Sequence, residues 1–355
     1  MNFDLLKKLC ETPGVSSREE PIRSVVVEEL RSLTDSITFD TMGNVVGTKK
    51  GNGGPKVMIA AHMDEIGFLV KHIDDRGFIR LQPIGGWDPR VMVAQRVYVH
   101  GFSGNRLLGA LMPAAKPIHL LTPEEMNKPP KIEEMYVDLG LPAEDVKAQV
   151  EVGDPVTMAR TAERVGNTVV SKTLDNRVSV FVMIEALRAV GAHACDILAV
   201  ATTQEEVGLR GATTAAYALK PDIGLAVDIT LANDFPGPAD HEQVTRLGNG
   251  AAIKVMDSSL ICHPKLVRHF RDVAEKHKIP YQLEILSRGG TDAGGIQRSQ
   301  AGIPSFTLSI PTRYVHTVNE MAAVSDIEAC ITLLARYLEE AETRQYGYEG
   351  DIGQA

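Results

Sequence analysis

The segment Thr202-Thr203-Gln204-Glu205-Glu206-Val207-Gly208 directly follows the apolar run Ile197-Leu198-Ala199-Val200-Ala201. The apolar run is typical of a buried strand, so two adjacent carboxylates stand where a core strand leaves its sheet. In α/β proteins the carboxyl ends of the strands are where ligands bind. A buried carboxylate is costly unless a cation or hydrogen-bond donors compensate its charge. Taken alone, the segment is more typical of a solvated loop, so its interpretation depends on the residues that end the other strands.

The bulk properties of the chain exclude several classes of function. Its 355 residues suffice for one large domain or two ordinary ones, and 44% hydrophobic with 23% charged residues is typical of a soluble globular protein. A net charge of −9 argues against nucleic acid or an anionic membrane surface as the main partner. No apolar run approaches the roughly 18 residues that span a bilayer, and the amino terminus lacks a signal-peptide core. The four cysteines form no CxxC pair, which favours reduced thiols in a cytoplasmic protein.

Helical and apolar segments alternate over most of the chain. This rhythm predicts an α/β fold with a doubly wound sheet. The further core strands are expected at Val57–Ala61, Ile223–Val227 and Pro304–Ile310, and the helices between strands at Val178–Val190, Gly211–Leu219 and Pro264–His277.

Residues 66–161 have a different texture. Short strand-like runs follow one another with turn signals such as Asp74-Asp75-Arg76-Gly77, and only residues 142–150 have a helical pattern. Closely spaced short strands with few helices predict an all-β barrel or sandwich inserted into the α/β chain. The predicted division is a catalytic domain in two parts (1–65 and 162–345), an inserted β-barrel (66–161) and a flexible tail (346–355).

Five residues of metal-ligand type stand at or just beyond the ends of predicted core elements: His62, Asp175, Glu206, Asp228 and His316. Each has a simpler interpretation: a lone histidine is usually structural, Asp175 is placed to cap the following helix, and Asp228 to cap a loop. Their occurrence together favours a metal site, because parallel strands deliver their carboxyl ends to one crevice.

Two histidines with three carboxylates suit a pair of borderline divalent ions such as zinc or cobalt. Oxygen donors alone would instead favour magnesium or calcium. A site for two ions needs one bridging carboxylate, for which we choose Asp175. One ion then takes His62 and Asp228, and the other takes His316 and Glu206.

Two further carboxylates are candidates for catalysis. Asp64 lies two residues beyond His62, so in an extended chain it faces the same side and can orient the imidazole, although simple surface exposure fits as well. Neighbouring residues of an extended chain face opposite sides, which would let Glu206 bind metal while Glu205 faces the reacting water. Glu205 is then the general base, and hydrolysis of a peptide bond is the predicted reaction.

The motifs around these residues resemble the tetrahedral-type dinuclear metallo-aminopeptidases, the group that contains glutamyl aminopeptidase and the deblocking aminopeptidases. The resemblance covers nearly the whole chain in order. It implies a doubly wound zinc-peptidase catalytic domain with an inserted barrel that mediates dimerisation, and often a twelve-subunit tetrahedral particle. It implies the same five metal ligands, with Glu205 as base and Asp64 behind His62. The matching segments are Ala61–Gly67, Lys172–Arg177, Gln204–Gly211, Ala226–Asp228, Gly289–Gly294 and Arg313–Thr317.

The function we expect is a cytoplasmic aminopeptidase that uses two zinc or cobalt ions to trim short peptides with a free amino terminus. Because the edges of an inserted β-module need a partner, we also expect a homo-oligomer, a dimer or a dodecamer. Substrate contacts are predicted for Lys254, Arg288 and Gly290. The alternatives are a surface or salt-bridged side chain for Lys254 and for Arg288, and a plain tight turn for Gly290. Some relatives bear the name endoglucanase, so a metal-dependent hydrolase of a glycan or an N-acyl amide is the second hypothesis. A catalytically inactive assembly protein is the third.

Overall fold

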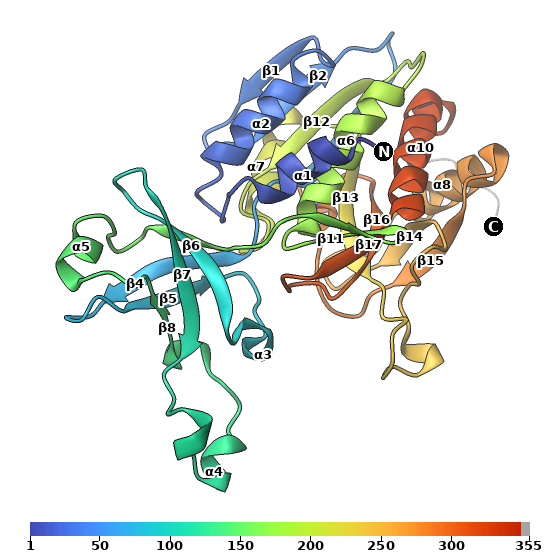
Figure 1. Cartoon of the computed structure of the whole chain (residues 1–355). Coiled ribbons are helices and arrows are strands. Elements are labelled where there is room, and N and C mark those ends of the chain that lie inside the picture. The colour runs from blue at the N-terminus through green and yellow to red at the C-terminus, as the bar shows by residue number, and fades with distance from the viewer. Residues whose placement is uncertain (349–355) are drawn as a thin grey trace.

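Strand pairing in the computed structural model divides the described residues, 1–348, between a large mixed sheet and a closed barrel (Figure 1). The centre of the large sheet is parallel, since β3 lies between β12 and β13, and β13 pairs in parallel with β16. Along its path the strands are β1 (Ser36–Phe39), β2 (Val45–Lys49), β12 (Asp196–Thr202), β3 (Lys56–His62), β13 (Ile223–Leu231), β16 (Ser305–Arg313), β17 (Glu320–Ala323), β11 (Thr168–Ser171) and β10 (Glu163–Val165). Off this path, β14 (Ala251–Met256) pairs with β16 and with β15 (Tyr281–Ile285).

Helices cover both faces of this sheet, because successive side chains of each central strand point to opposite sides. On β3, Val57 and Ile59 belong to one apolar core, whereas Met58 and Ala60 belong to a second. The first core is covered by α1 (Phe3–Glu11), α2 (Glu20–Leu30), α6 (Leu174–Ala189), α8 (Pro264–His277) and α10 (Val324–Glu340). The second is covered by α7 (Arg210–Leu219) and α9 (Asp292–Gln297).

The barrel stands beside the large sheet as a separate body (Figure 1). Its apolar interior includes Phe68, which stacks on Trp87 at 4.9 Å between ring centroids. Between its fourth and fifth strands in chain order, residues 114–134 form an arm that projects away from both bodies (Figure 1). The barrel strands are β4 (Gly67–Ile73), β5 (Ile79–Ile84), β6 (Gln95–His100), β7 (Arg106–Pro113), β8 (Met135–Asp138) and β9 (Pro155–Met158), closed in the order β4-β5-β8-β7-β6-β9.

The β-module contains two short helices that the sequence analysis did not predict. In the β-module the sequence predicted a helix only over 142–150, where α5 (Ala143–Lys147) lies, but α3 (Pro89–Met92) and α4 (Pro123–Met126) are also present. Asp88 and Thr122 cap these two helices, and a proline follows each cap. The remaining single turns are η1 (Ile118–Leu120), η2 (Ile132–Glu134), η3 (Asp240–Glu242) and η4 (Ala341–Thr343).

The predicted fold class, a doubly wound α/β domain with an inserted all-β barrel, is confirmed. The predicted tail 346–355 begins with a buried residue, since Tyr346 is 6% exposed and its hydroxyl lies 3.1 Å from that of Tyr337. Residues 349–355 lie outside the described residues. Within residues 1–348, no helix has the length and apolar character needed to cross a membrane.

Candidate metal centre

A crevice opens where two central strands part. Pairing between β3 and β13 ends at Ala60 and Ala226, while β3 continues beside β12 as far as His62. His62 is the last residue of β3, and Asp228 lies two residues beyond the end of the β3–β13 pairing. The sequence predicted that Asp228 follows its strand, but β13 continues to Leu231 beside β16. Asp228 therefore projects from a fixed strand and does not cap a loop.

The remaining predicted ligands reach the crevice from three other elements. Asp175 lies at the irregular start of α6, where its own backbone is not helical (φ −77°, ψ 101°). Its carboxylate faces His62 and His316, so the interpretation of Asp175 as the helix cap is wrong. The neighbouring Asn176 ties this turn to β13, because its side-chain N–H donates to the carbonyl of Val227 at 3.0 Å. His316 lies in the loop after β16, and Glu206 in the turn after β12.

Asp175 lies between the two histidines and presents one carboxylate oxygen to each. Its Oδ1 is 3.2 Å from His62 Nε2, and its Oδ2 is 3.3 Å from His316 Nε2. Asp228 Oδ1 is 3.9 Å from His62 Nε2, and Glu206 Oε2 is 3.6 Å from His316 Nε2. Two donors bound to one tetrahedral zinc ion at 2.0–2.1 Å lie about 3.3 Å apart, so these separations suit shared cations. All five predicted ligands are thus gathered in one place.

Two carboxylate oxygens of the cluster lack a hydrogen-bond partner within residues 1–348. Asp175 Oδ1 and Glu206 Oε1 are buried and have no hydrogen-bond partner among the described residues. Burial, followed by repulsion from Asp175, raises the pKa of Glu206 to about 8. Burial also raises the pKa of Asp228 well above its ordinary value. Such orphaned, crowded oxygens fit a bound cation, because a cation supplies the missing partner and favours the ionised carboxylates.

The surrounding carboxylates also raise the pKa values of the two histidines. Burial acts to lower the pKa of His62, but Glu205, Asp175 and other carboxylates outweigh burial and hold that pKa well above its ordinary value. The pKa of His316 is raised to about 10, because Asp175 and Glu206 overcome the opposing effect of burial. Metal binding to neutral imidazoles would therefore displace protons that the metal-free cluster retains.

Glu205 lies closer to the ligands than the sequence argument predicted. The chain is not extended here, because Gln204 has a left-handed backbone (φ 53°) and residues 206–208 form a turn. Both glutamates therefore point into the centre, with Glu205 Oε2 3.7 Å from His62 Nε2. His62, Glu205 and Asp228 present one donor atom each within 4.8 Å of one another, as do His62, Asp175 and Glu206. By position, Glu205 is suited either to bind a cation or to act on a water beside one.

Asp64 is fully buried, so the alternative of surface exposure is wrong. The main-chain carbonyl of Asp64 lies 3.1 Å from His62 Nδ1, and its carboxylate lies 3.5 Å from the same nitrogen. The carboxylate also accepts hydrogen bonds from the main-chain N–H groups of Glu205 (3.0 Å) and Glu206 (3.3 Å) and from the Ser16 hydroxyl (2.6 Å). One side chain thereby touches the end of β3 and the glutamate turn after β12.

Glu320, at the start of β17, is a residue that sequence reasoning missed. It is 1% exposed and accepts hydrogen bonds from the main-chain N–H groups of Asp175 (2.9 Å) and His316 (2.8 Å). The only signal in the sequence was an acid at the head of a short apolar run, which is too common to interpret alone.

An open cleft of about 570 Å³ borders the centre. The predicted substrate contacts Arg288 and Gly290 line it, and Arg288 is the only lysine or arginine among the described residues that do so. Lys254 is elsewhere: it is fully buried, forms an ion pair with Glu284 and does not line the described cleft. The salt-bridged alternative for Lys254 therefore fits the structure better than a substrate contact. The other walls are largely apolar and include Ile229, Leu231, Leu286 and Val315.

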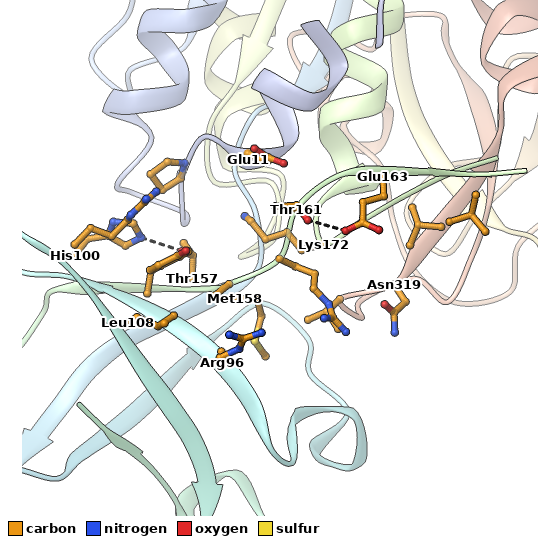
Figure 2. Close-up of a pocket in the computed structure, with 18 residues that line it drawn as sticks. Glu11, Arg96, His100, Leu108, Thr157, Met158, Thr161, Glu163, Lys172 and Asn319 are labelled. Atoms are coloured by element: carbon orange, nitrogen blue, oxygen red, sulfur yellow. Dashed lines mark hydrogen bonds between the residues drawn. The ribbon is translucent and has the colours of Figure 1, made fainter. Parts of the chain in front are cut away.

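A second cleft, of about 690 Å³, lies between the barrel and the β10–β11 ribbon (Figure 2). Figure 2 shows His100 and Arg96 reaching it from the barrel and Lys172 from the opposite side. His100 Nε2 lies 2.9 Å from the Thr157 hydroxyl, and burial lowers the pKa of this histidine to about 4. No predicted metal ligand is among the described residues that line this cleft, so it is separate from the metal centre.

Comparisons with known proteins find similarity over nearly the full chain. A family model described as M42 glutamyl aminopeptidase matches residues 43–333. The lysyl aminopeptidase of Pyrococcus furiosus is 37% identical over 356 residues, which cover 98% of this chain and 99% of that protein. A solved aminopeptidase from the archaeon Desulfurococcus kamchatkensis has a TM-score of 0.91 and 42% identity, covering 95% of this chain and 94% of its own. The TET1 peptidase of Pyrococcus horikoshii, which can assemble into a tetrahedron or a large octahedral shell, has a TM-score of 0.84 and 30% identity, covering 95% and 99%.

Proposed function

The chain belongs to the M42 glutamyl aminopeptidase family and is a metal-dependent aminopeptidase, and we propose that it works with two divalent ions and a glutamate base. The observation that carries this proposal is Asp175, which presents one oxygen to each histidine at 3.2 and 3.3 Å. A carboxylate in this position suits a bridge between two ions. Because the donors are imidazole and carboxylate groups, zinc or cobalt are the proposed metals.

The proposed ligand sets keep the pairs that the sequence predicted, although Glu205 Oε2 (3.7 Å) is slightly nearer to His62 Nε2 than Asp228 Oδ1 (3.9 Å). One ion takes His62 and Asp228, the other takes His316 and Glu206, and Asp175 joins both. When bound, such ions polarise the carbonyl of the scissile bond and lower the pKa of a water molecule. Asp64 holds the glutamate turn through two main-chain N–H groups and lies behind His62, so we propose that it keeps both segments in register.

Glu205 is proposed to move the proton. Its carboxylate is 9% exposed and lies against His62 without being needed in either ligand set. Burial, then the nearby Asp228 and Glu206, raise the pKa of Glu205 well above its ordinary value, although His62 opposes this shift. A carboxylate with a raised pKa can accept a proton from the attacking water and return it to the leaving amine.

The substrate we propose is a short peptide with a free amino terminus. A volume of about 570 Å³ falls within the usual range for small-ligand sites of roughly 300–1,000 Å³, so it suits the end of a peptide better than a folded chain. Arg288 and Gly290, which line the cleft, remain proposed substrate contacts.

Assembly and compartment complete the proposal. We propose that residues 66–161 form a separate domain whose barrel mediates dimerisation, with a dodecamer as the larger particle. The projecting arm supports a partner, since Leu120 and Met126 are 67% and 51% exposed on it. The proposed compartment is the cytoplasm, because all four cysteines are buried free thiols.

Metal analysis combined with a panel of aminoacyl-anilides tests the function. We expect two ions per chain and release of aniline that a chelator abolishes and zinc or cobalt restores. A glycan and an N-acyl amide belong in the same panel, because hydrolysis of another bond is the alternative. Metal-dependent release of reducing sugar without peptide cleavage would overturn the proposed substrate. A protein that binds no metal and cleaves nothing would favour the inactive assembly protein.

A further inference from the structure

We infer that Glu320 is a positioning residue that holds one of the two proposed metal sites in shape; this inference rests on the function proposed above. Its carboxylate joins two ligands from distant parts of the chain. Oε2 accepts the main-chain N–H of Asp175 at 2.9 Å, and Oε1 accepts that of His316 at 2.8 Å. Glu320 is 1% exposed, so water has little access to replace it at either N–H group.

The two anchored segments need an external partner. His316 lies in a loop where both it (φ 61°) and Tyr314 (φ 59°) have left-handed backbones. Such a conformation is unfavourable for a residue with a side chain, so it persists only where other contacts favour it. The N–H of Asp175 is likewise engaged by Glu320 at the irregular start of α6. Glu320 therefore fixes the backbone of both residues that face each other across 3.3 Å.

Apart from the shared Asp175, the other proposed site is supported independently of Glu320. His62 ends β3, whose pairing with β12 extends through His62 itself, and its ring contacts the Asp64 carbonyl at 3.1 Å. Asp228 lies within β13, paired in register with β16. Loss of Glu320 should thus loosen the site of His316 and Glu206 more than that of His62 and Asp228.

The variant Glu320→Gln isolates this role because it preserves size. One carboxylate oxygen becomes an amide NH₂, so a donor faces a donor at one of the two anchored N–H groups. Partners that orient metal ligands typically contribute 10–100-fold to metal affinity. We expect a loss of that size at one ion and little change at the other.

Asp326 provides a matched control for the general cost of removing such a carboxylate. It is fully buried and accepts two main-chain N–H groups, of Gly248 at 2.7 Å and Gly250 at 2.8 Å. It is not among the described residues that line the cleft. Asp326→Asn should therefore affect folding without a selective effect on metal.

The test is a calorimetric titration of chelator-stripped, full-length protein with zinc, together with thermal melts of each metal-free variant. Wild type and Asp326→Asn should bind two ions, whereas Glu320→Gln should bind one normally and the second 10–100-fold more weakly. If Glu320→Gln fails to fold, Glu320→Asp serves, since its shorter side chain cannot span both N–H groups. Two ions bound with wild-type affinity by the tested variant would overturn the inference while leaving the proposed function intact. A wild-type protein that binds no ion would overturn both.

Discussion

Replacing Glu205 with glutamine separates the two chemical roles that its position allows. The side chain keeps its size, and the main-chain N–H that Asp64 accepts at 3.0 Å is untouched. If Glu205 is the base, both ions remain, because the proposed ligand sets do not need it. If it is a ligand, as its grouping with His62 and Asp228 permits, one ion should be lost.

The expected loss of activity is large. General acid–base catalysis contributes about 10²–10⁴-fold to rate, which is about 3–5 kcal/mol of activation free energy. The metal-free Glu205→Gln protein should not be less stable than metal-free wild type. Burial and the nearby Asp228 and Glu206 disfavour the ionised carboxylate of Glu205, and a neutral amide relieves that repulsion. The variant should therefore melt no lower than wild type once both are stripped of metal.

The assay combines kcat/KM on an aminoacyl-anilide with the metal content of the same sample. Glu206→Gln is the contrast, because it should lose one ion together with activity. The account of Glu205 as base is refuted if Glu205→Gln keeps activity within tenfold of wild type. It is equally refuted if the variant holds a single ion, since Glu205 would then be a ligand.

Three further predictions follow from the burial and charge of particular residues. Chelation should lower the melting temperature, and the metal-free protein should then lose stability as pH rises from about 5 to 8. The reason is that the pKa of Glu206 is raised from 4.5 to about 8 in the folded state, so the native protein keeps a proton that the unfolded chain releases. Melting temperatures that do not change across this pH range would contradict the prediction. Lys254→Met leaves the buried carboxylate of Glu284 without its cation, so urea denaturation should show the free energy of unfolding reduced by about 3–5 kcal/mol, while KM stays within twofold. A large rise in KM would indicate that Lys254 contacts the substrate. Arg288→Ala should raise KM, most for substrates with an acidic first residue, at unchanged metal content, and an unchanged KM for every substrate would exclude Arg288 as a contact.

The gathering of the ligands was predictable because it depends on sheet topology. Apolar runs identified the central strands, and parallel strands deliver their carboxyl ends to one crevice. His62 and Asp228 are held there by the pairing of strands whose apolar runs are visible in the sequence.

The failures came from features that depend on local backbone or on distant contacts. Glutamine has no preference for a left-handed backbone, so the sequence does not predict the conformation of Gln204. That conformation turns both glutamates toward the centre. Lys254 was ambiguous in the sequence because its partner, Glu284, faces it across the β14–β15 register. The role of Glu320 depends on main-chain groups of two remote segments, which no periodicity encodes.

The most direct test of the central claim is an anomalous difference map, recorded at the zinc edge from crystals of the zinc-loaded protein. We predict two peaks per chain on either side of Asp175, one bordered by His62 and Asp228 and the other by His316 and Glu206. A single peak, or none at these residues, would contradict a two-ion centre bridged by Asp175.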